Sequence, residues 1–223
     1  GLTPGVLNYI ASQPSYDVAS PLANVVNLMN NGAVPLEARQ WFFGARLVAL
    51  QKKGGGIRPV ACGDVLRRIA GKFLSAFAVK KMHVTMFRQF AIGRSGGLDS
   101  IVQTFRGFAA NMRDSLDTCM VFADFSNAFN KASRQRMLEV IAAKTPTLMP
   151  YAMAAYSAHT VLLFGDNIIT SQQGGQQGDP LMGLFFSLVL DDVLARIGGP
   201  DHKRFADLAG PTALYLDDAS FGG

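Results

Sequence analysis

Two short apolar segments of this chain each end at acidic residues, a pattern that few folds can accommodate. Residues 119–123 end at Asp124, and residues 211–216 end at Asp217 and Asp218. Both segments have the length and composition of strands. Side chains at the ends of neighbouring strands can converge in space, although these two segments are far apart in the sequence. The pattern is compatible with a sheet that gathers carboxylates at one edge, although these residues alone favour the alternative of surface acids at the starts of loops.

The rest of the chain alternates between helical and hairpin patterns. Helices are expected at residues 18–30, from Asp64 to about residue 90, and at 101–112, 134–143, 146–157 and 180–197. Strand–turn–strand patterns are expected at 46–60 and 160–171, each with glycine in its turn. Helices mixed with hairpins and long-range strands predict an α+β fold, with an antiparallel sheet and helices on one face.

Basic residues are concentrated in the first half of the chain. Residues 1–110 hold 13 Lys and Arg against 4 Asp and Glu, a charge of +9, whereas residues 111–223 hold 8 against 12, a charge of −4. Between Arg39 and Arg94 there are 12 basic residues and one acid, Asp64. Basic side chains that neutralise phosphates release condensed counterions. The asymmetry indicates nucleic acid as a partner, with a solvated basic face as the alternative.

Cysteine usage and apolar runs exclude several classes of protein. Cys62 and Cys119 lie 57 positions apart, so the chain has no CxxC spacing for zinc and no disulfide framework. No stretch approaches 18 uninterrupted apolar residues, and the first residues lack the pattern of a signal peptide. We expect a reduced intracellular protein of the cytoplasm or nucleus, with no membrane partner.

Three local sequences carry a resemblance to a known family. The segments DFSNAFN (residues 124–130), QGDPL (177–181) and YLDD (215–218) resemble three successive motifs of reverse transcriptases, in the family's order. Residues 52–60 are similar to the family's fingers hairpin, and residues 93–99 resemble, more loosely, its glycine-rich segment. Among reverse transcriptases, these motifs resemble those of non-LTR retrotransposons and related retroelements.

The resemblance implies a polymerase palm, with an antiparallel sheet and helices on one face, plus N-terminal fingers. We expect a fingers-like basic region at residues 1–115 and a palm with the catalytic Asp motifs at 116–223. The chain begins without Met and stops soon after Asp218. We therefore expect an excised fragment, with an incomplete return strand after the Asp-Asp turn and without the thumb. Endonuclease or RNase H regions belong, on this reading, to the longer parent chain.

Roles for the acidic and aromatic residues follow from the same resemblance. Asp124 and Asp217 are expected to be metal ligands, with Asp218 completing the acidic pair and the main-chain oxygen of Phe125 as a further ligand. Phe129 matches the aromatic residue beneath the incoming sugar, where its ring clashes with a ribose 2′-hydroxyl and so favours deoxynucleotides.

Roles for the nucleotide-binding residues are also implied. Lys53 and Arg58 are expected to clamp the triphosphate, with Lys52 as the alternative to Lys53 because the glycine run blurs the register.

Gln177 and Gly178 are expected to line the nucleotide and template side, where a missing side chain permits close approach. Gln176 is the alternative register for the glutamine.

The implied reaction is the attack of a DNA primer 3′-hydroxyl on the α-phosphate of a dNTP, directed by an RNA template. Two Mg²⁺ ions are the expected cofactors, with Mn²⁺ as a substitute. Two alternatives stay open. One is a non-catalytic, reverse-transcriptase-like module that binds nucleic acid, and the other is a viral-type RNA-dependent RNA polymerase palm.

Several residues resemble functional groups but have a simpler interpretation. Asp191 and Asp192 lie in a helical pattern, where adjacent side chains diverge, so a solvated edge is favoured over a metal site. The three histidines share no ligand spacing. Core packing is favoured for Phe73, Phe77, Phe185 and Phe186, and packing is favoured over base stacking for residues 41–43. Arg67 and Arg68 either contact template phosphates or lie on a solvated helix face.

Overall fold

The computed structural model describes residues 3–13, 17–82, 88–196 and 210–222. Within these ranges the helices are α1 (Pro4–Ala11), α2 (Ala19–Asn30), α3 (Leu36–Phe42), α4 (Val65–Met82), α5 (Gly97–Asn111), α6 (Ala128–Lys131), α7 (Arg134–Lys144), the 3₁₀ turn η1 (Pro146–Leu148), α8 (Met149–Tyr156) and α9 (Met182–Arg196). The strands are β1 (Ala45–Gln51), β2 (Ile57–Gly63), β3 (Met120–Asp124), β4 (Thr160–Phe164), β5 (Asn167–Ser171), β6 (Thr212–Tyr215) and β7 (Asp218–Gly222). No helix in the described part of the chain is long and apolar enough to cross a bilayer.

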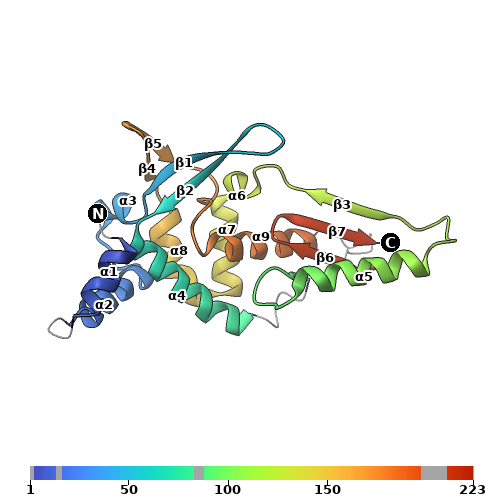
Figure 1. The fold of residues 1–223 in the computed structure, drawn as a ribbon, viewed down its shortest axis with the longest axis horizontal. Helices are drawn as coiled ribbons and strands as arrows, with labels where there is room; N and C mark the ends of the chain where they lie inside the picture. The colour runs from blue at the N-terminus through green and yellow to red at the C-terminus, as the bar shows by residue number, and fades with distance from the viewer. Residues whose placement is uncertain (1–2, 14–16, 83–87, 197–209, 223) are drawn as a thin grey trace.

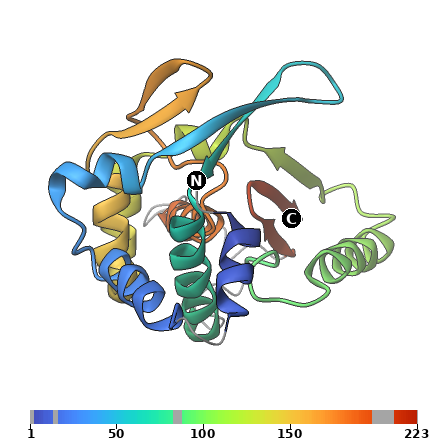
Figure 2. The same ribbon diagram turned by 60° about the vertical axis from the view of Figure 1, so that its left-hand side comes forward.

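The strands form two sheets. The four-stranded sheet has the order β2-β1-β4-β5, in which β1 pairs with β4 in parallel and the two hairpins are antiparallel. Both hairpins project from the upper edge of the molecule, above α2, α4 and α8 (Figures 1 and 2). The other sheet is antiparallel, with the order β3-β7-β6. The expected α+β architecture is confirmed, and the expected boundary near residue 115 stays a prediction because β1 and β4 pair across it.

The three-stranded sheet brings the acidic segments together. The register pairs Asp124 of β3 with Asp218 of β7, and Tyr215 of β6 with the same Asp218. Leu216 and Asp217 therefore form a two-residue turn, and Leu216 has the positive φ of 56° that such tight turns require. The return strand, which was expected to be incomplete, is β7, and it pairs with β3 along five residues.

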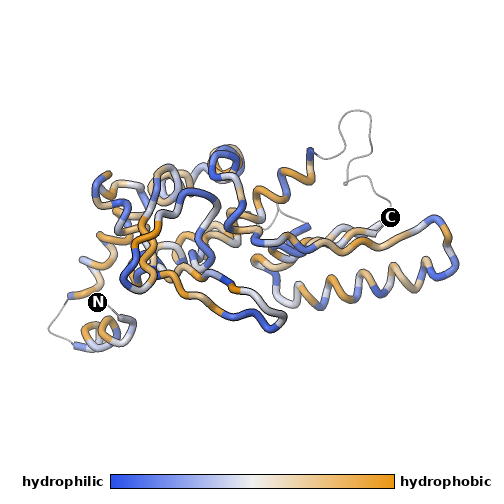
Figure 3. The backbone as a smooth tube through the Cα atoms, turned by 90° about the horizontal axis from the view of Figure 1, so that it is seen from above, coloured by the Kyte–Doolittle hydropathy of each residue, from blue (hydrophilic) through white to orange (hydrophobic). Residues whose placement is uncertain are grey.

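The core lies mainly among α7, α8 and α9. Helix α9 is buried on most sides, as expected for a nearly continuous apolar run. Helix α5 instead extends along the three-stranded sheet at one end of the molecule, with apolar and polar residues alternating along it (Figure 3). Phe105 of α5 contacts Phe122 of β3, with ring centroids 5.9 Å apart.

Two helix boundaries differ from the expectation for physical reasons. The helix that begins after Asp64 does not reach residue 90, because Gln89 bridges Leu214 and the amide of Phe90 donates to the Leu214 carbonyl at 2.8 Å. This pairing with β6 competes with the local helical pattern. Helix α5 begins at Gly97, four residues before the expected start, directly after Gly96 at a φ of 65°.

Candidate active site

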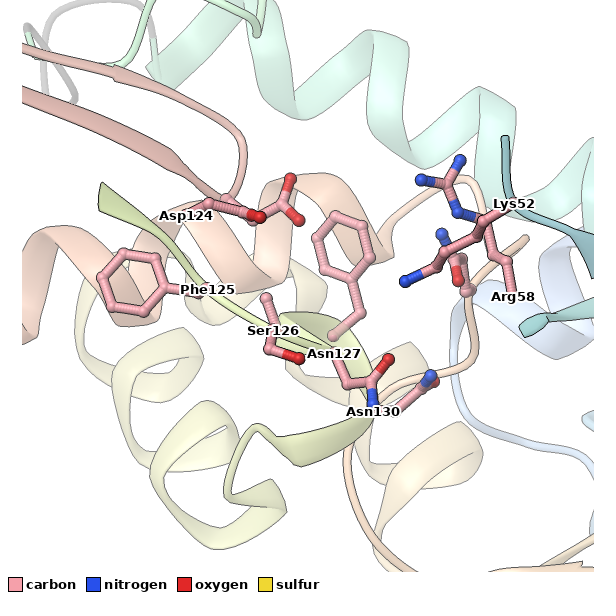
Figure 4. A pocket seen from close by; sticks show the side chains of 11 residues that line it. Lys52, Arg58, Asp124, Phe125, Ser126, Asn127 and Asn130 are labelled. Carbon is pink, nitrogen blue, oxygen red and sulfur yellow. The ribbon is translucent and has the colours of Figure 1, made fainter. Parts of the chain in front are cut away.

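A pocket of about 140 Å³ lies where the three-stranded sheet meets the β1–β2 hairpin. Its lining consists of Lys52, Arg58, Gln177, Asp217 and the continuous segment 124–130. Figure 4 shows the Asp124 carboxylate on one side and the Lys52 and Arg58 side chains on the opposite side. Acidic and basic side chains from separate segments therefore line the same pocket. The basic side chains are suited to bind a phosphate group.

The acidic side of the pocket is built by strand ends. Asp124 is the last residue of β3 and Asp217 lies in the β6–β7 turn, so both carboxylates reach the lining. Asp218 is the first residue of β7, opposite Asp124, and is exposed outside that lining. Burial raises the pKa of the Asp218 carboxyl, and the neighbouring Asp217 and Asp124 carboxylates raise it further. The three acids of the two apolar segments thus interact electrostatically.

The basic side comes from the β1–β2 hairpin. Lys52 follows β1, and its amide donates to the Gly56 carbonyl at 3.1 Å across the glycine turn. Arg58 lies on β2. Lys52 lines the pocket and Lys53 does not, so the expectation that Lys53 faces the phosphates is not met by this hairpin, whose turn fixes the register. Within the described residues neither Lys52 nor Arg58 has an acidic partner, which leaves both cations available to an anion.

Phe129 faces the pocket from α6 but also packs against the core. Its ring is edge-on to Phe186, with centroids 5.2 Å apart, and its carbonyl accepts a hydrogen bond from Gly175 at 2.8 Å. Asn127, two residues before Phe129, has a positive φ of 54° and turns the chain after β3. Phe125 is exposed and its ring points away from Lys52 (Figure 4), while its carbonyl accepts from the Ala128 amide at 3.2 Å.

The two glutamines of the polar loop have different environments. Gln177 lines the pocket, whereas Gln176 is buried and its amide group bonds Thr160 and the Phe43 carbonyl. Gly178 lies beside β2 rather than in the lining, since a Cβ on it would sit 2.3 Å from the Ala61 carbonyl oxygen. The close approach expected at Gly178 is therefore to the chain's own backbone.

Gly178→Ala should lower the free energy of unfolding by about 1–3 kcal/mol. The position combines a φ of +132° with that 2.3 Å approach to Ala61, so an added methyl group is strained and displaces β2. Gly107→Ala in α5 is the matched control, because an added Cβ there meets open space and alanine favours a helix. Urea unfolding of both variants measures the difference, and equal stability of the two would contradict the clash.

The sequence interpretation missed two features of this region. Ser126, Asn127 and Asn130 line the pocket, although only their neighbours in the motif were given roles. Arg67 is neither a template contact nor a solvated residue: it is 1% exposed and forms an ion pair with Asp179 at 2.7 Å. The signal was its helical spacing with buried alanines and leucine on α4.

The other candidate residues are resolved by their contacts. Asp191 pairs with Lys144 at 2.6 Å and Asp192 with Arg136 at 2.5 Å, so the two acids connect α9 to α7 as ion-paired, largely buried side chains and do not form the expected solvated edge. His159 is exposed, and the other two histidines lie outside the described residues.

The phenylalanines divide between core and surface. Phe185 and Phe186 are buried as expected, but Phe73 and Phe77 are 61% and 41% exposed, so the expectation of core packing was wrong for them. At about 100° per residue, both lie at the margin of the α4 face that carries the buried Arg67, Ala70 and Leu74. Of residues 41–43, Phe43 is fully buried and Trp41 is exposed.

Comparison with known proteins identifies the fold. No protein-family model and no curated protein matches the chain. Among solved structures, an apo telomerase from Candida tropicalis, truncated from its C-terminal domain, superposes with a TM-score of 0.56 at 12% identity over 81% of this chain and 44% of that chain. The Sicinivirus 3Dpol RNA-dependent RNA polymerase superposes with a TM-score of 0.55 at 16% identity over 95% of this chain and 45% of that chain. The chain has a polymerase palm fold and spans less than half the length of these two neighbours.

Proposed function

We propose that the chain is the fingers and palm of an RNA-directed DNA polymerase of a retroelement, acting inside the cell. The observation that carries the proposal is the pocket lined by Asp124, Asp217, Lys52 and Arg58, in which the Asp124 carboxylate lies opposite the two basic side chains (Figure 4). Nucleotidyl transfer needs cationic groups for the triphosphate and carboxylates that would hold divalent metal ions beside the reacting phosphate. One pocket supplies both sets of groups from segments distant in sequence.

The donor set fits magnesium. Mg²⁺ prefers oxygen ligands and is usually held by one or two carboxylates together with substrate phosphates. Asp124 and Asp217 supply two carboxylates in the pocket. The described residues contain no group of three or more His, Cys, Asp or Glu that could hold a metal ion alone. Asp124 and Asp217 would hold the ions together with phosphate oxygens of the substrate, with Asp218 adjacent, and the bound ions would supply positive charge for the phosphate that is transferred; Mn²⁺ is the expected substitute.

The chain's own residues bind and orient the substrates. Lys52 and the Arg58 guanidinium neutralise the triphosphate, and Arg58 can contact two phosphate oxygens at once. Gln177 lines the nucleotide side of the pocket, and the Phe129 ring limits the space beneath the sugar. Positioning of a primer 3′-hydroxyl in line with the α-phosphate then supplies most of the rate, since the protein forms no covalent bond.

An RNA-dependent RNA polymerase is the second candidate, because the Sicinivirus enzyme superposes on 95% of this chain. The Phe129 ring in the pocket favours the deoxynucleotide assignment. Primer extension by the full-length chain on an RNA template, with dNTPs or rNTPs and Mg²⁺, separates the two candidates. We expect extension with dNTPs. Template binding without extension by either set of nucleotides would instead support the non-catalytic module.

Nucleic-acid binding should weaken steeply with salt. If basic residues in the first half of the chain neutralise three phosphates of a single strand, a plot of the logarithm of the binding constant against the logarithm of the salt concentration has a slope of about −2. Binding of a labelled RNA–DNA primer–template between 50 and 200 mM salt, in Ca²⁺ to prevent turnover, measures the slope. A flat plot would contradict the assignment of the basic residues to phosphate contact.

A further inference from the structure

A buried guanidinium connects the fingers helix α4 to the loop that carries Gln177. Arg67 Nη1 donates to Gln176 Oε1 at 2.5 Å, and Arg67 Nη2 donates to Asp179 Oδ2 at 2.7 Å. Nη1 also donates to the Phe43 carbonyl at 2.6 Å, and the Tyr156 hydroxyl donates to Asp179 Oδ2 at 2.6 Å. Every one of these side chains is buried. Two arms of one planar group therefore bind residues on both sides of Gln177 and Gly178.

Gln177 and Gly178 form a two-residue arch between these fixed points. The first foot, Gln176, also donates to Thr160 Oγ1 at 2.9 Å. The second foot, Asp179, accepts from the Leu181 amide at 2.9 Å at the approach to α9. The top of the arch is held against β2, because the Ala61 amide donates to the Gln177 carbonyl at 2.7 Å. The carbonyl of Gln177 is therefore hydrogen-bonded to β2, whereas the residue also lines the pocket.

We propose that Arg67 is a positioning residue for nucleotide binding, which fixes both feet of the arch and so presents Gln177 to the pocket. The inference rests on the proposed function only for its kinetic consequence. The geometry explains why the residue is arginine: a lysine ammonium lacks the planar fork that reaches Gln176 and Asp179 together.

The charge of Arg67 is retained in this site. Burial has the largest single effect and lowers the pKa of the guanidinium, but the Asp179 carboxylate together with Tyr156 and Tyr151 raises it by more, so the pKa lies above its usual value. Removal of either partner would leave a buried charge without compensation, which is strongly destabilising. The informative variants are therefore those that keep the ion pair and release only one foot of the arch.

Arg67→Lys and Gln176→Leu are such variants. Arg67→Lys keeps a cation beside Asp179, and Gln176→Leu keeps the ion pair while freeing the first foot. The control is Arg136→Lys, which alters an ion pair to Asp192 between α7 and α9, outside the pocket lining. The full-length proteins are compared by amide hydrogen exchange and by single-nucleotide insertion.

We expect the Ala61 amide to exchange about tenfold faster in both test variants and at the wild-type rate in the control. Its partner is Gln177, so its exchange reports on the arch without any need for turnover. The KM for dNTP should rise about tenfold with kcat within threefold, because binding rather than the chemical step is weakened.

Three results decide the proposal. Unchanged Ala61 exchange in both Arg67→Lys and Gln176→Leu overturns it. Faster exchange with a reduced kcat and an unchanged KM also overturns it, since that pattern is a loss of folded enzyme. A wild-type chain that does not extend a primer refutes the proposed function instead, and the exchange rates then decide whether Arg67 holds the arch.

Discussion

Asp124→Asn and Asp217→Asn should each reduce primer extension below about one per cent of the wild-type rate, with template binding nearly unchanged. Both residues line the pocket that Lys52 and Arg58 also line, and Figure 4 shows the Asp124 carboxylate opposite these two basic side chains. An amide keeps the size of the side chain but removes the charge that holds a divalent cation beside the triphosphate. Single-turnover extension with a saturating dNTP in Mg²⁺ measures the loss.

The chain contains a matched control for this experiment. Asp191→Asn and Asp192→Asn also neutralise an acidic pair, but these residues bind Lys144 and Arg136 on α7. We expect extension to remain within about threefold of wild type, since an ion pair of this kind contributes little beyond local stability. Equal losses at the two acidic pairs, or extension above one per cent in both Asp124→Asn and Asp217→Asn, would refute the assignment.

The sequence predicted the parts of the fold and the site that depend on local patterns. Apolar runs that end at Asp124 and at Asp217 located β3 and β6, and glycine-containing turns located the two hairpins of the other sheet. The convergence of the acids follows from β7, which pairs with both β3 and β6. A short strand after the Asp-Asp turn was too close to the end of the sequence to be recognised from its pattern.

Long-range contacts account for what the sequence did not show. Gln89 pairs with Leu214 across more than a hundred residues, and this contact overrides the helical pattern around it. The helical spacing of Arg67 places it on the buried face of α4, but its partners Asp179 and Gln176, which make that burial possible, are distant in sequence and no local pattern reveals them. The same network distinguishes the two glutamines: Gln176 is bound by Arg67, whereas Gln177 lines the pocket. The role of Gln177 in nucleotide binding stays a prediction.

Substitutions at Phe129 should change the choice between deoxyribonucleotides and ribonucleotides. Phe129 lines the pocket and its ring also packs edge-on against Phe186, so the proposed gating role has to be separated from a structural one. Steric crowding of a ribose 2′-oxygen costs about 1–3 kcal/mol. This corresponds to roughly 5- to 150-fold discrimination at about 1.4 kcal/mol per tenfold. Phe129→Ala and Phe129→Val should raise the rNTP-to-dNTP ratio of kcat/KM within that range, with a smaller loss of dNTP use.

Phe186→Leu separates the gate from the packing. Phe186 is buried and lies outside the pocket lining, so this variant weakens the same edge-on contact without opening space beneath the sugar. We expect Phe186→Leu to lower the unfolding temperature and leave the nucleotide ratio unchanged. Single-nucleotide insertion with a matched dNTP and rNTP gives the ratio for each variant. If both positions lower stability and neither changes the ratio, Phe129 is a core residue that closes β3, and the preference for deoxynucleotides must come from another part of the pocket.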